Sequence, residues 1–160
     1  MAKIGIIGGS GLDDPKILRN PEELETSTRF GAPSSPLSCG VIEGTEVILL
    51  ARHGRAHTIP PSQVNYRANI LALQGAGCTH ILATTAVGSL REGIERGDLV
   101  ILDQFIDFTR HRSVTFHDYF PPGDATHTAM AEPFSSELRE RLIASARALG
   151  VRFHPTGTVV

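Results

Sequence analysis

The sequence predicts an α/β protein with a mixed, mainly parallel central sheet flanked by helices. Short apolar, β-branched segments such as 3–7 and 47–51 alternate along the chain with segments whose apolar residues recur at helical spacing, such as 135–149. Glycines follow both kinds of segment, as they often do where strands and helices end. Strands that alternate with helices are typical of a sheet whose parallel strands are covered by helices.

Each predicted strand is a short run of apolar and β-branched residues bounded by residues that favour turns. The expected strands are residues 3–7, 37–42, 46–51, 79–86 and 98–106, and another begins at Val151. The segment Glu43-Gly44-Thr45 is expected to be the turn of a hairpin between the second and third of these strands. Residues 15–36 lack a strand pattern, and we expect a loop there with weak helical content at best.

Two segments have the apolar spacing of amphipathic helices. The first is expected to begin at a Ser62 cap and to run to about Leu73, and the second to open at Ser135 or Ser136 and to end before Gly150. Residues 108–133 show neither period and hold three of the seven histidines. We therefore expect an interface or active-site loop there, the alternative being a disordered surface insertion.

The composition excludes several classes of protein. A formal net charge of −2 gives no general attraction to nucleic acid or to an anionic membrane, so neither is expected as a partner. The longest apolar runs, such as 47–51, are far shorter than the ~18 residues that a membrane helix needs. Cys39 and Cys78 are too few for a disulfide framework, and they suggest reduced structural thiols in a cytoplasmic protein.

Groups suited to an anion follow three of the predicted strands. The first loop is Gly8-Gly9-Ser10-Gly11, the second runs from Arg52 to His57, and the third is 84–90, which begins Thr84-Thr85-Ala86 and follows the apolar part, 79–83, of its strand. Free backbone N–H groups, hydroxyls and the planar fork of arginine all donate to phosphate oxygens. Because the carboxyl ends of parallel strands meet at one edge of a sheet, the three loops together predict a site for phosphate or a phosphorylated group.

The same loops argue against other kinds of site, although each has a simpler explanation when taken alone. The first lacks the third small residue of a dinucleotide fingerprint, and Asp13 and Asp14 would repel a pyrophosphate. His53 and His57 suit a metal only on a helix, so no metal is expected. The first and third loops are also explained as tight turns, and the second as a basic turn paired with acidic residues elsewhere.

Several motifs, taken in order, resemble those of the trimeric purine nucleoside phosphorylases, and most closely those of the branch that acts on 5′-methylthioadenosine. The resemblance rests on residues 6–12, 50–55, 64–70, 84–90, 97–107 and 130–134, and so extends over essentially the whole chain. It implies phosphorolysis of S-methyl-5′-thioadenosine by inorganic phosphate, giving adenine and 5-methylthio-α-ribose-1-phosphate in methionine and purine salvage. The branch that prefers 6-oxopurine nucleosides or methylthioinosine is the alternative within the family.

The resemblance also assigns residues. It implies that phosphate is bound by Ser10, Arg52, His53, Thr85 and Ala86, and that His127 reaches the neighbouring subunit's substrate. It further implies a homotrimer or a multiple of it, whose ligands are a purine nucleoside and phosphate. Neither a metal nor an organic cofactor is implied. Inorganic phosphate is a co-substrate of the reaction and not a cofactor.

One departure from the family bears on the catalytic residue. Family members continue beyond the strand that begins at Val151, and the later part carries the aspartate that hydrogen-bonds the leaving base. No catalytic residue is therefore assigned, and neither Asp103 nor Asp107 is expected to take that role.

We expect residues 1–160 to form a single α/β domain that is incomplete at its C-terminus. A non-catalytic binding or assembly module is the alternative from another class, and a nucleotide-dependent oxidoreductase is a third.

Overall fold

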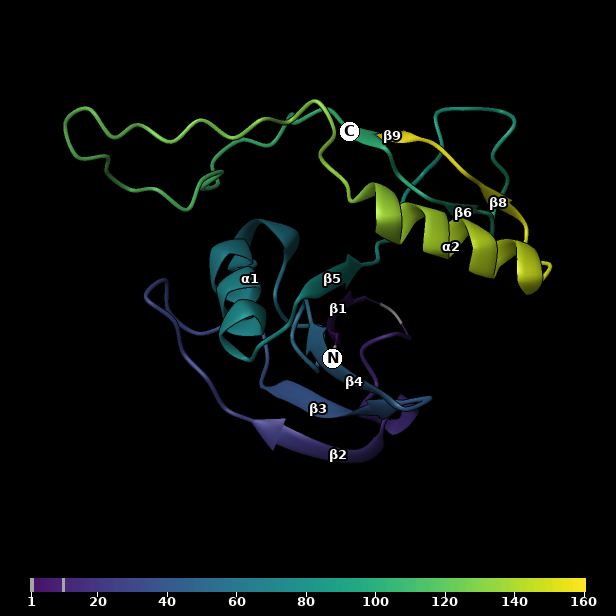
Figure 1. The fold of residues 1–160 in the computed structure, drawn as a ribbon, viewed down its shortest axis with the longest axis horizontal. Coiled ribbons are helices and arrows are strands. Elements are labelled where there is room, and N and C mark those ends of the chain that lie inside the picture. Colours follow the sequence, from purple (N-terminus) through teal and green to yellow (C-terminus); the bar gives the residue numbers. More distant parts are fainter. Residues whose placement is uncertain (1, 10) are drawn as a thin grey trace. The chain divides into compact units, whose positions relative to one another are not determined.

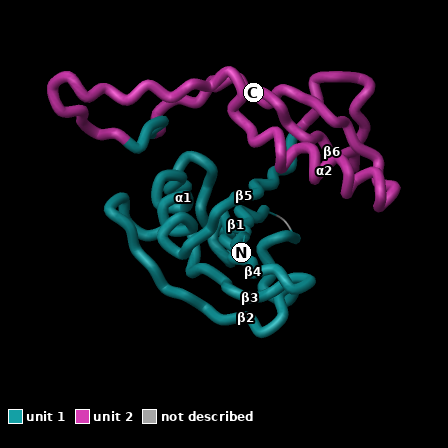
Figure 2. The backbone as a smooth tube through the Cα atoms, in the orientation of Figure 1, with its two compact units in different colours: residues 1–87, 113–116 teal, residues 88–112, 117–160 magenta. Residues whose placement is uncertain are grey.

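The chain divides into two compact units in a computed structural model that describes residues 2–9 and 11–160 (Figure 2). Unit 1 comprises residues 1–87 and 113–116, and unit 2 comprises residues 88–112 and 117–160. A division into compact units does not decide how many domains a chain has. The expectation that residues 1–160 form a single domain therefore stays a prediction.

Unit 1 is built on a five-stranded sheet in the order β2-β3-β4-β1-β5 (Figure 1). Its strands are β1 (Lys3–Gly8), β2 (Arg19–Leu24), β3 (Leu37–Ile42), β4 (Thr45–Ala51) and β5 (His80–Ala83). β1 runs parallel to β4 and β5, whereas β3 is antiparallel to β2 and β4. The predicted α/β class with a mixed sheet is confirmed.

The three parallel strands end at the same level of the sheet. Gly8 at the end of β1 is in register with Ala51 at the end of β4, and Ile7 is in register with Ala83 at the end of β5. The loops that follow these strands therefore start side by side, as the sequence predicts.

β4 contributes to two hydrophobic clusters in the core of unit 1, because both faces of this strand are buried. Ile48 and Leu50 pack in one cluster with Leu73 of α1 (Tyr66–Gly75), which lies beside the sheet in Figure 1. Val47 and Leu49 pack in a second cluster. A strand buried on both faces reads as a continuous apolar run, which is the pattern of residues 47–51.

The predicted hairpin forms, but its turn is Glu43-Gly44 because Thr45 already belongs to β4, and the first helix begins later than predicted. Glu43 and Gly44 both have positive φ, of 45° and 80°, which a two-residue turn between twisted antiparallel strands requires. The expected cap, Ser62, lies within a short 3₁₀ helix, η2 (Pro61–Gln63). The cap is Asn65, whose side-chain oxygen accepts from the Ala68 N–H at 3.2 Å.

The expectation of a loop with weak helical content over residues 15–36 is only partly right. A 3₁₀ helix, η1 (Pro15–Ile17), is followed by the strand β2, and every residue of β2 is exposed. β2 lies at the edge of the sheet, includes Pro21 and pairs with β3 through an irregular register. An exposed edge strand carries no apolar alternation, so the sequence gives no strand signal.

Unit 2 contains α2 (Ser136–Ala148), which begins and ends close to the predicted positions. Ser135 is its cap, and the Ser135 hydroxyl accepts from the Leu138 N–H at 3.3 Å. Two parallel pairs of short strands make up the sheets of this unit. They are β6 (Leu99–Val100) with β8 (Phe153–His154), and β7 (Gln104–Phe105) with β9 (Thr158–Val159).

The predicted strands 98–106 and 151 onward are each divided into two short strands. Between the two pairs, the Asp103 carboxylate accepts the Gly157 N–H at 3.0 Å, and the Asp103 N–H donates to the Gly157 carbonyl at 3.2 Å. β5 likewise ends at Ala83, three residues before its predicted end. Residues 108–133 contain no helix or strand, which agrees with the predicted loop.

Two further expectations concern thiols and membrane helices. Cys39 and Cys78 are free and partly buried, and burial raises the pKa of both thiols, which favours the protonated form. Within residues 2–9 and 11–160, the structure has no helix with the length and apolar character needed to cross a membrane.

Asp98 is the centre of an ion-pair network in unit 2. Its side chain is only 2% exposed, and it accepts from His154 Nε2 at 2.8 Å while Arg152 Nε lies 3.0 Å away. The Glu95 backbone N–H donates to the same carboxylate at 2.9 Å. The hydrogen bond from His154, followed by that from Glu95, lowers the pKa of Asp98 below 3.8.

This lowered pKa predicts that acid destabilises unit 2. The contribution of Asp98 to the free energy of unfolding is complete above pH 3.8 and is lost as the pH falls through the lowered pKa of the folded state. Asp98→Asn should therefore destabilise unit 2 at pH 7 and reduce the loss of stability that wild type shows as the pH falls below 3.8. Hydrogen exchange of the α2 amides measures both effects. Glu137→Gln, which removes an exposed pair with Arg141, is the control, and equal acid sensitivity of the Asp98 variant and wild type would contradict the assignment.

Candidate functional site

A cavity of about 480 Å³ lies in unit 1 where the loops after β1, β4 and β5 meet. It is lined by Gly9, Leu12, Arg52, His53, Pro61, Tyr66, Thr84, Thr85 and Ala86. Four of the five residues expected to bind phosphate are therefore brought together: Arg52, His53, Thr85 and Ala86. The fifth, Ser10, lies outside the described residues.

Arg52 connects the ends of all three strands. Its backbone N–H donates to the Gly8 carbonyl at 3.2 Å, which continues the pairing of β4 with β1. Its side chain crosses to the third loop, where Nη1 donates to the Thr84 carbonyl at 2.5 Å. The guanidinium is thus held over the carboxyl ends of the parallel strands.

Gly9 allows the guanidinium to lie close to the first loop. A Cβ at this position would be 2.8 Å from Arg52 Nη2, closer than side chains normally approach. Among residues 2–9 and 11–160, no carboxylate forms an ion pair with Arg52. A partly buried guanidinium is stabilised by an opposite charge, so the cavity has the electrostatic character of an anion site.

His53 is fixed by the loop that follows it. Its Nδ1 lies 2.8 Å from the Ile59 carbonyl, and the Ile59 N–H donates to the His53 carbonyl at 3.0 Å. Arg52 Nε lies 3.3 Å from the other ring nitrogen, Nε2. Both ring nitrogens therefore have partners within the same loop.

The other two basic residues of the second loop lie beside acidic side chains, and neither lines the cavity. Arg55 forms an ion pair with Glu23 and donates to the Ser38 hydroxyl at 2.9 Å. His57 Nε2 lies 3.7 Å from Asp13 Oδ2. The interpretation of residues 52–57 as a basic turn paired with acids elsewhere thus fits Arg55 and His57, while Arg52 and His53 face the cavity.

The sequence analysis did not single out three of the lining residues, Leu12, Pro61 and Tyr66. Tyr66 is the first residue of α1, and its hydroxyl donates to the Pro61 carbonyl at 3.2 Å. The motif over residues 64–70 and the prolines before it were visible in the sequence. Their position beside the strand ends depends on how α1 packs, which no local pattern specifies.

The remaining residues considered from the sequence lie in unit 2. His127 is exposed, in a segment without helix or strand. Asp103 accepts from the Gly157 N–H, and Asp107 accepts from the Thr109 N–H at 2.8 Å. The bonds from Thr109 lower the pKa of Asp107. Both carboxylates thus have local structural partners, and neither was expected to contact the leaving base.

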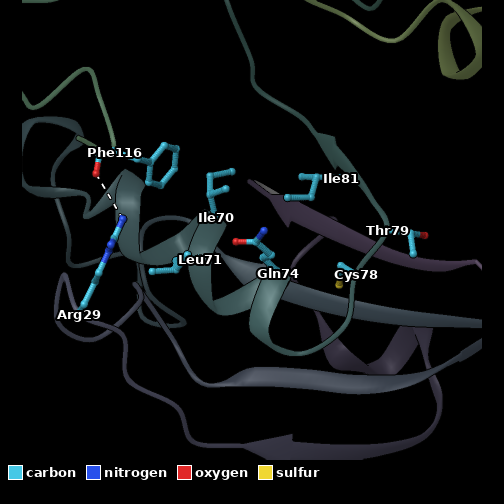
Figure 3. Close-up of a pocket in the computed structure, with 8 residues that line it drawn as sticks. All are labelled: Arg29, Ile70, Leu71, Gln74, Cys78, Thr79, Ile81 and Phe116. Carbon is cyan, nitrogen blue, oxygen red and sulfur yellow. Dashed lines mark hydrogen bonds between the residues drawn. The ribbon is translucent and has the colours of Figure 1, made fainter. Parts of the chain in front are cut away.

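A second cavity, of about 410 Å³, lies along α1 and is largely apolar (Figure 3). Ile70, Leu71 and Ile81 contribute to its wall, with Phe116 at one end. The Arg29 side chain donates to the Phe116 carbonyl at 3.3 Å. This cavity lies away from the carboxyl ends of the strands.

In the part of the chain that the structure describes, no group of three or more His, Cys, Asp or Glu side chains could hold a metal ion.

Gly9→Ala should weaken phosphate binding with little loss of stability. The added Cβ would meet the end of the Arg52 side chain, which can move aside, so the guanidinium rather than the backbone is displaced. We expect the dissociation constant for inorganic phosphate to rise about tenfold, the effect of losing one hydrogen bond to a charged group. Calorimetric titration measures it. Gly75→Ala, which meets nothing within 4 Å, is the control, and unchanged binding by the Gly9 variant would contradict the prediction.

Comparison with known proteins identifies the family. The sequence profile of the phosphorylase superfamily matches residues 3–160. S-methyl-5′-thioadenosine phosphorylase of Danio rerio is 56% identical over 160 residues, covering 99% of this chain and 57% of the Danio rerio protein. The protein of the same name from Hyperthermus butylicus is 49% identical over 159 residues, with the same two coverages.

Solved structures agree with the sequence comparison. Methylthioadenosine phosphorylase from Schistosoma mansoni in its apo form is 41% identical, with a TM-score of 0.91 over 100% of this chain and 64% of its own. A double mutant of the adenosine/methylthioadenosine phosphorylase from the same organism, in complex with adenine, is 41% identical with a TM-score of 0.92, over 100% and 63%. The chain spans about 57% of the length of the curated relatives. Because the family profile covers nearly every residue, this chain belongs to the phosphorylase superfamily.

Proposed function

We propose that this protein is a phosphorylase that cleaves S-methyl-5′-thioadenosine with inorganic phosphate. The products would be adenine and 5-methylthio-α-ribose-1-phosphate, which serve purine and methionine salvage. The observation that carries the proposal is the Arg52 guanidinium, which lies without a carboxylate partner among the described residues in a cavity at the ends of three parallel strands.

In this proposal the cavity holds the phosphate that attacks the sugar. The fork of Arg52 binds two phosphate oxygens, and the Thr85 hydroxyl and Ala86 N–H are further donors in the cavity wall. As the base leaves, the sugar carbon gains positive charge, which a phosphate held beside it stabilises and then bonds to. Ser10 is proposed as another phosphate ligand on the sequence resemblance alone.

The finer parts of the proposal rest on the resemblance and on the relatives. Two relatives at 56% and 49% identity are named S-methyl-5′-thioadenosine phosphorylase, which supports that substrate over a 6-oxopurine nucleoside. A homotrimer in which His127 reaches the neighbouring subunit's substrate belongs to the same proposal, as does the use of phosphate without an organic cofactor. A cytoplasmic location agrees with the two free thiols.

The test is a phosphorolysis assay on the protein expressed from its natural gene. It is incubated with S-methyl-5′-thioadenosine, inosine or methylthioinosine, each with and without inorganic phosphate. We expect adenine release from the first substrate only when phosphate is present. Base release without phosphate would indicate a hydrolase, preference for the other two substrates would indicate the 6-oxopurine branch, and a lack of any turnover would favour a binding module.

A further inference from the structure

We propose that a clamp of three side chains holds the middle of the loop 108–133 against unit 1 and thereby positions the part of the loop that carries His127. The clamp consists of Arg29, Phe30 and Arg67. The segment that it holds, which we call the strap, is Ser113–Phe116; it belongs to unit 1, although the loop on either side belongs to unit 2. The role of His127 rests on the proposed function, whereas the contacts of the clamp do not.

The ring of Phe30 is the centre of the clamp. The guanidinium carbon of Arg67 lies 4.1 Å from the ring centroid, and that of Arg29 lies 4.8 Å from it. Both distances are within the ~6 Å at which an aromatic face attracts a cation. Because two like charges near one ring repel each other, the arrangement is stable only if both guanidiniums also have other attractive partners.

The strap supplies such partners with its backbone and one aromatic side chain. Arg29 donates to the Phe116 carbonyl at 3.3 Å, as Figure 3 shows, and Arg67 Nη1 donates to the Thr115 carbonyl at 3.5 Å. The rings of Phe116 and Phe30 have centroids 6.0 Å apart, within the range of favourable aromatic pairs. Two consecutive carbonyls and one ring therefore attach the strap to the clamp.

Phe30 is itself fixed to the start of α1. The N–H groups of Thr28 and Gly31 each donate to the other residue's carbonyl at 2.9 Å, which closes the turn that carries Phe30. Asn65, the cap of α1, donates from Nδ2 to the Phe30 carbonyl at 2.7 Å. The surface on which the strap packs is therefore held in place by unit 1 itself, and a preformed surface loses little conformational entropy when a segment binds to it.

Arg67 is placed against the electrostatic preference of its helix. It is the second residue of α1, where the positive end of the helix dipole favours acidic side chains over basic ones. A cation at this position does not stabilise the helix. Its contacts with Phe30 and the strap give it a role that helix stability does not.

The exposed fractions of the loop's side chains indicate that Phe116 is the anchor. Phe116 is 38% exposed, whereas Val114 of the strap is 71% exposed and Phe108 is 75% exposed. Anchoring at Phe116 leaves residues 117–133 as the free part of the loop, and His127 lies within it. A shorter free segment has fewer conformations, so bringing His127 to a substrate loses less entropy.

The first experiment measures release of the strap by limited digestion of the full chain with trypsin. Trypsin cleaves after arginine and needs several extended residues on both sides of the bond, so the strap must leave the clamp before the chain is cut after Arg112. Phe30→Ala removes the aromatic ring, and we expect cleavage after Arg112 to become at least about tenfold faster. Cleavage after Arg91, which lies outside the loop, is the internal reference.

Two conservative variants separate cation–π attraction from packing. Phe30→Leu keeps apolar bulk without an aromatic face and should also be cleaved faster after Arg112, whereas Phe30→Tyr keeps the face and should be cleaved at the wild-type rate. A wild-type rate in Phe30→Leu would overturn the role of the two cations. Equal rates in wild type and Phe30→Ala would overturn the clamp.

Arg67→Gln tests the clamp without changing Phe30. It should speed cleavage after Arg112 about threefold, since one cation–π contact is lost, and it should not destabilise α1. Arg141→Gln, which removes an exposed arginine of α2 that pairs with Glu137, is the matched control and should leave the rate unchanged. Hydrogen exchange of the β4 amides shows that unit 1 stays folded in each variant. Equal cleavage of Arg67→Gln and Arg141→Gln would contradict the proposal.

The last experiment separates this proposal from the proposed function. If wild type cleaves S-methyl-5′-thioadenosine with phosphate, Phe30→Ala should raise the KM for the nucleoside about threefold or more and leave the KM for phosphate unchanged. Faster cleavage by trypsin with both KM values unchanged would overturn the positioning of His127. If wild type shows no turnover, the proposed function fails, and the cleavage rates still decide whether the clamp holds the strap.

Discussion

Arg52→Ala should weaken the binding of inorganic phosphate about a hundredfold, which corresponds to the loss of two charge-assisted hydrogen bonds at the low end of their range. The guanidinium has no carboxylate partner among the described residues, so its removal leaves no buried acid unpaired. The loss should therefore appear in binding more than in folding. Calorimetric titration with phosphate, together with thermal unfolding of the same samples, measures the two quantities separately.

Two further variants sharpen this prediction. Arg52→Lys keeps the positive charge but lacks the planar fork, so its phosphate affinity should lie between those of wild type and the alanine variant. Arg55→Ala removes an arginine from the same loop that is paired with Glu23 and lies outside the cavity, and it should bind phosphate normally. Wild-type affinity in Arg52→Ala, or an equal loss in Arg55→Ala, would remove Arg52 from the anion site.

Leu73→Ala should lower the free energy of unfolding of unit 1 by about 2–5 kcal/mol, the range observed when a buried leucine is truncated. Leu73 has no exposed surface, and it packs with Ile48 and Leu50 between α1 and the sheet. Its methyl groups lie 3.1 and 3.3 Å from where a Cβ of Gly5 would be, so the helix lies close against β1. Urea-dependent hydrogen exchange of the β4 amides reports the change in this unit.

Gln74→Ala is the matched control for that prediction. Gln74 is the next residue of α1 and is exposed, and alanine suits a helix, so the change should be within about 0.5 kcal/mol. A similar effect of the two substitutions would mean that α1 does not pack on the sheet as the structure has it.

The parts of the fold that could be predicted are those with a strong local signal. The apolar run 47–51 predicted a buried strand, and Glu43-Gly44 predicted the hairpin, because burial and positive φ each restrict the residues allowed. The β2 strand and the start of α1 were missed for the opposite reason. An exposed edge strand needs no apolar pattern, and either Ser62 or Asn65 could have capped the helix.

The candidate site was predicted to a similar extent. The three loops were expected to come together because parallel strands bring the loops at their carboxyl ends to one edge of the sheet, and the family resemblance selected Arg52, His53, Thr85 and Ala86 within them. Tyr66 could not be placed there in advance, since its position depends on the packing of α1. Residue types and spacing could not distinguish Arg52 from Arg55, which only the family resemblance did, because the acid that pairs with Arg55, Glu23, lies on the strand that the sequence did not reveal.

By itself, the sequence determined the α/β class, the family resemblance and the three loops from which an anion site is built. These follow from residue types and short-range spacing, which local backbone preferences and burial translate directly into strands, helices and turns. Only the tertiary structure decided which hydrogen bonds hold Arg52 and His53, and that Arg55 of the same loop pairs with Glu23. Hydrogen bonds such as those of Arg52 to Thr84 and of His53 to Ile59 join separate loops or fix a side chain against its own loop. Their geometry depends on distances in space, which are set by the register of the strands and not by the order of residues along the chain.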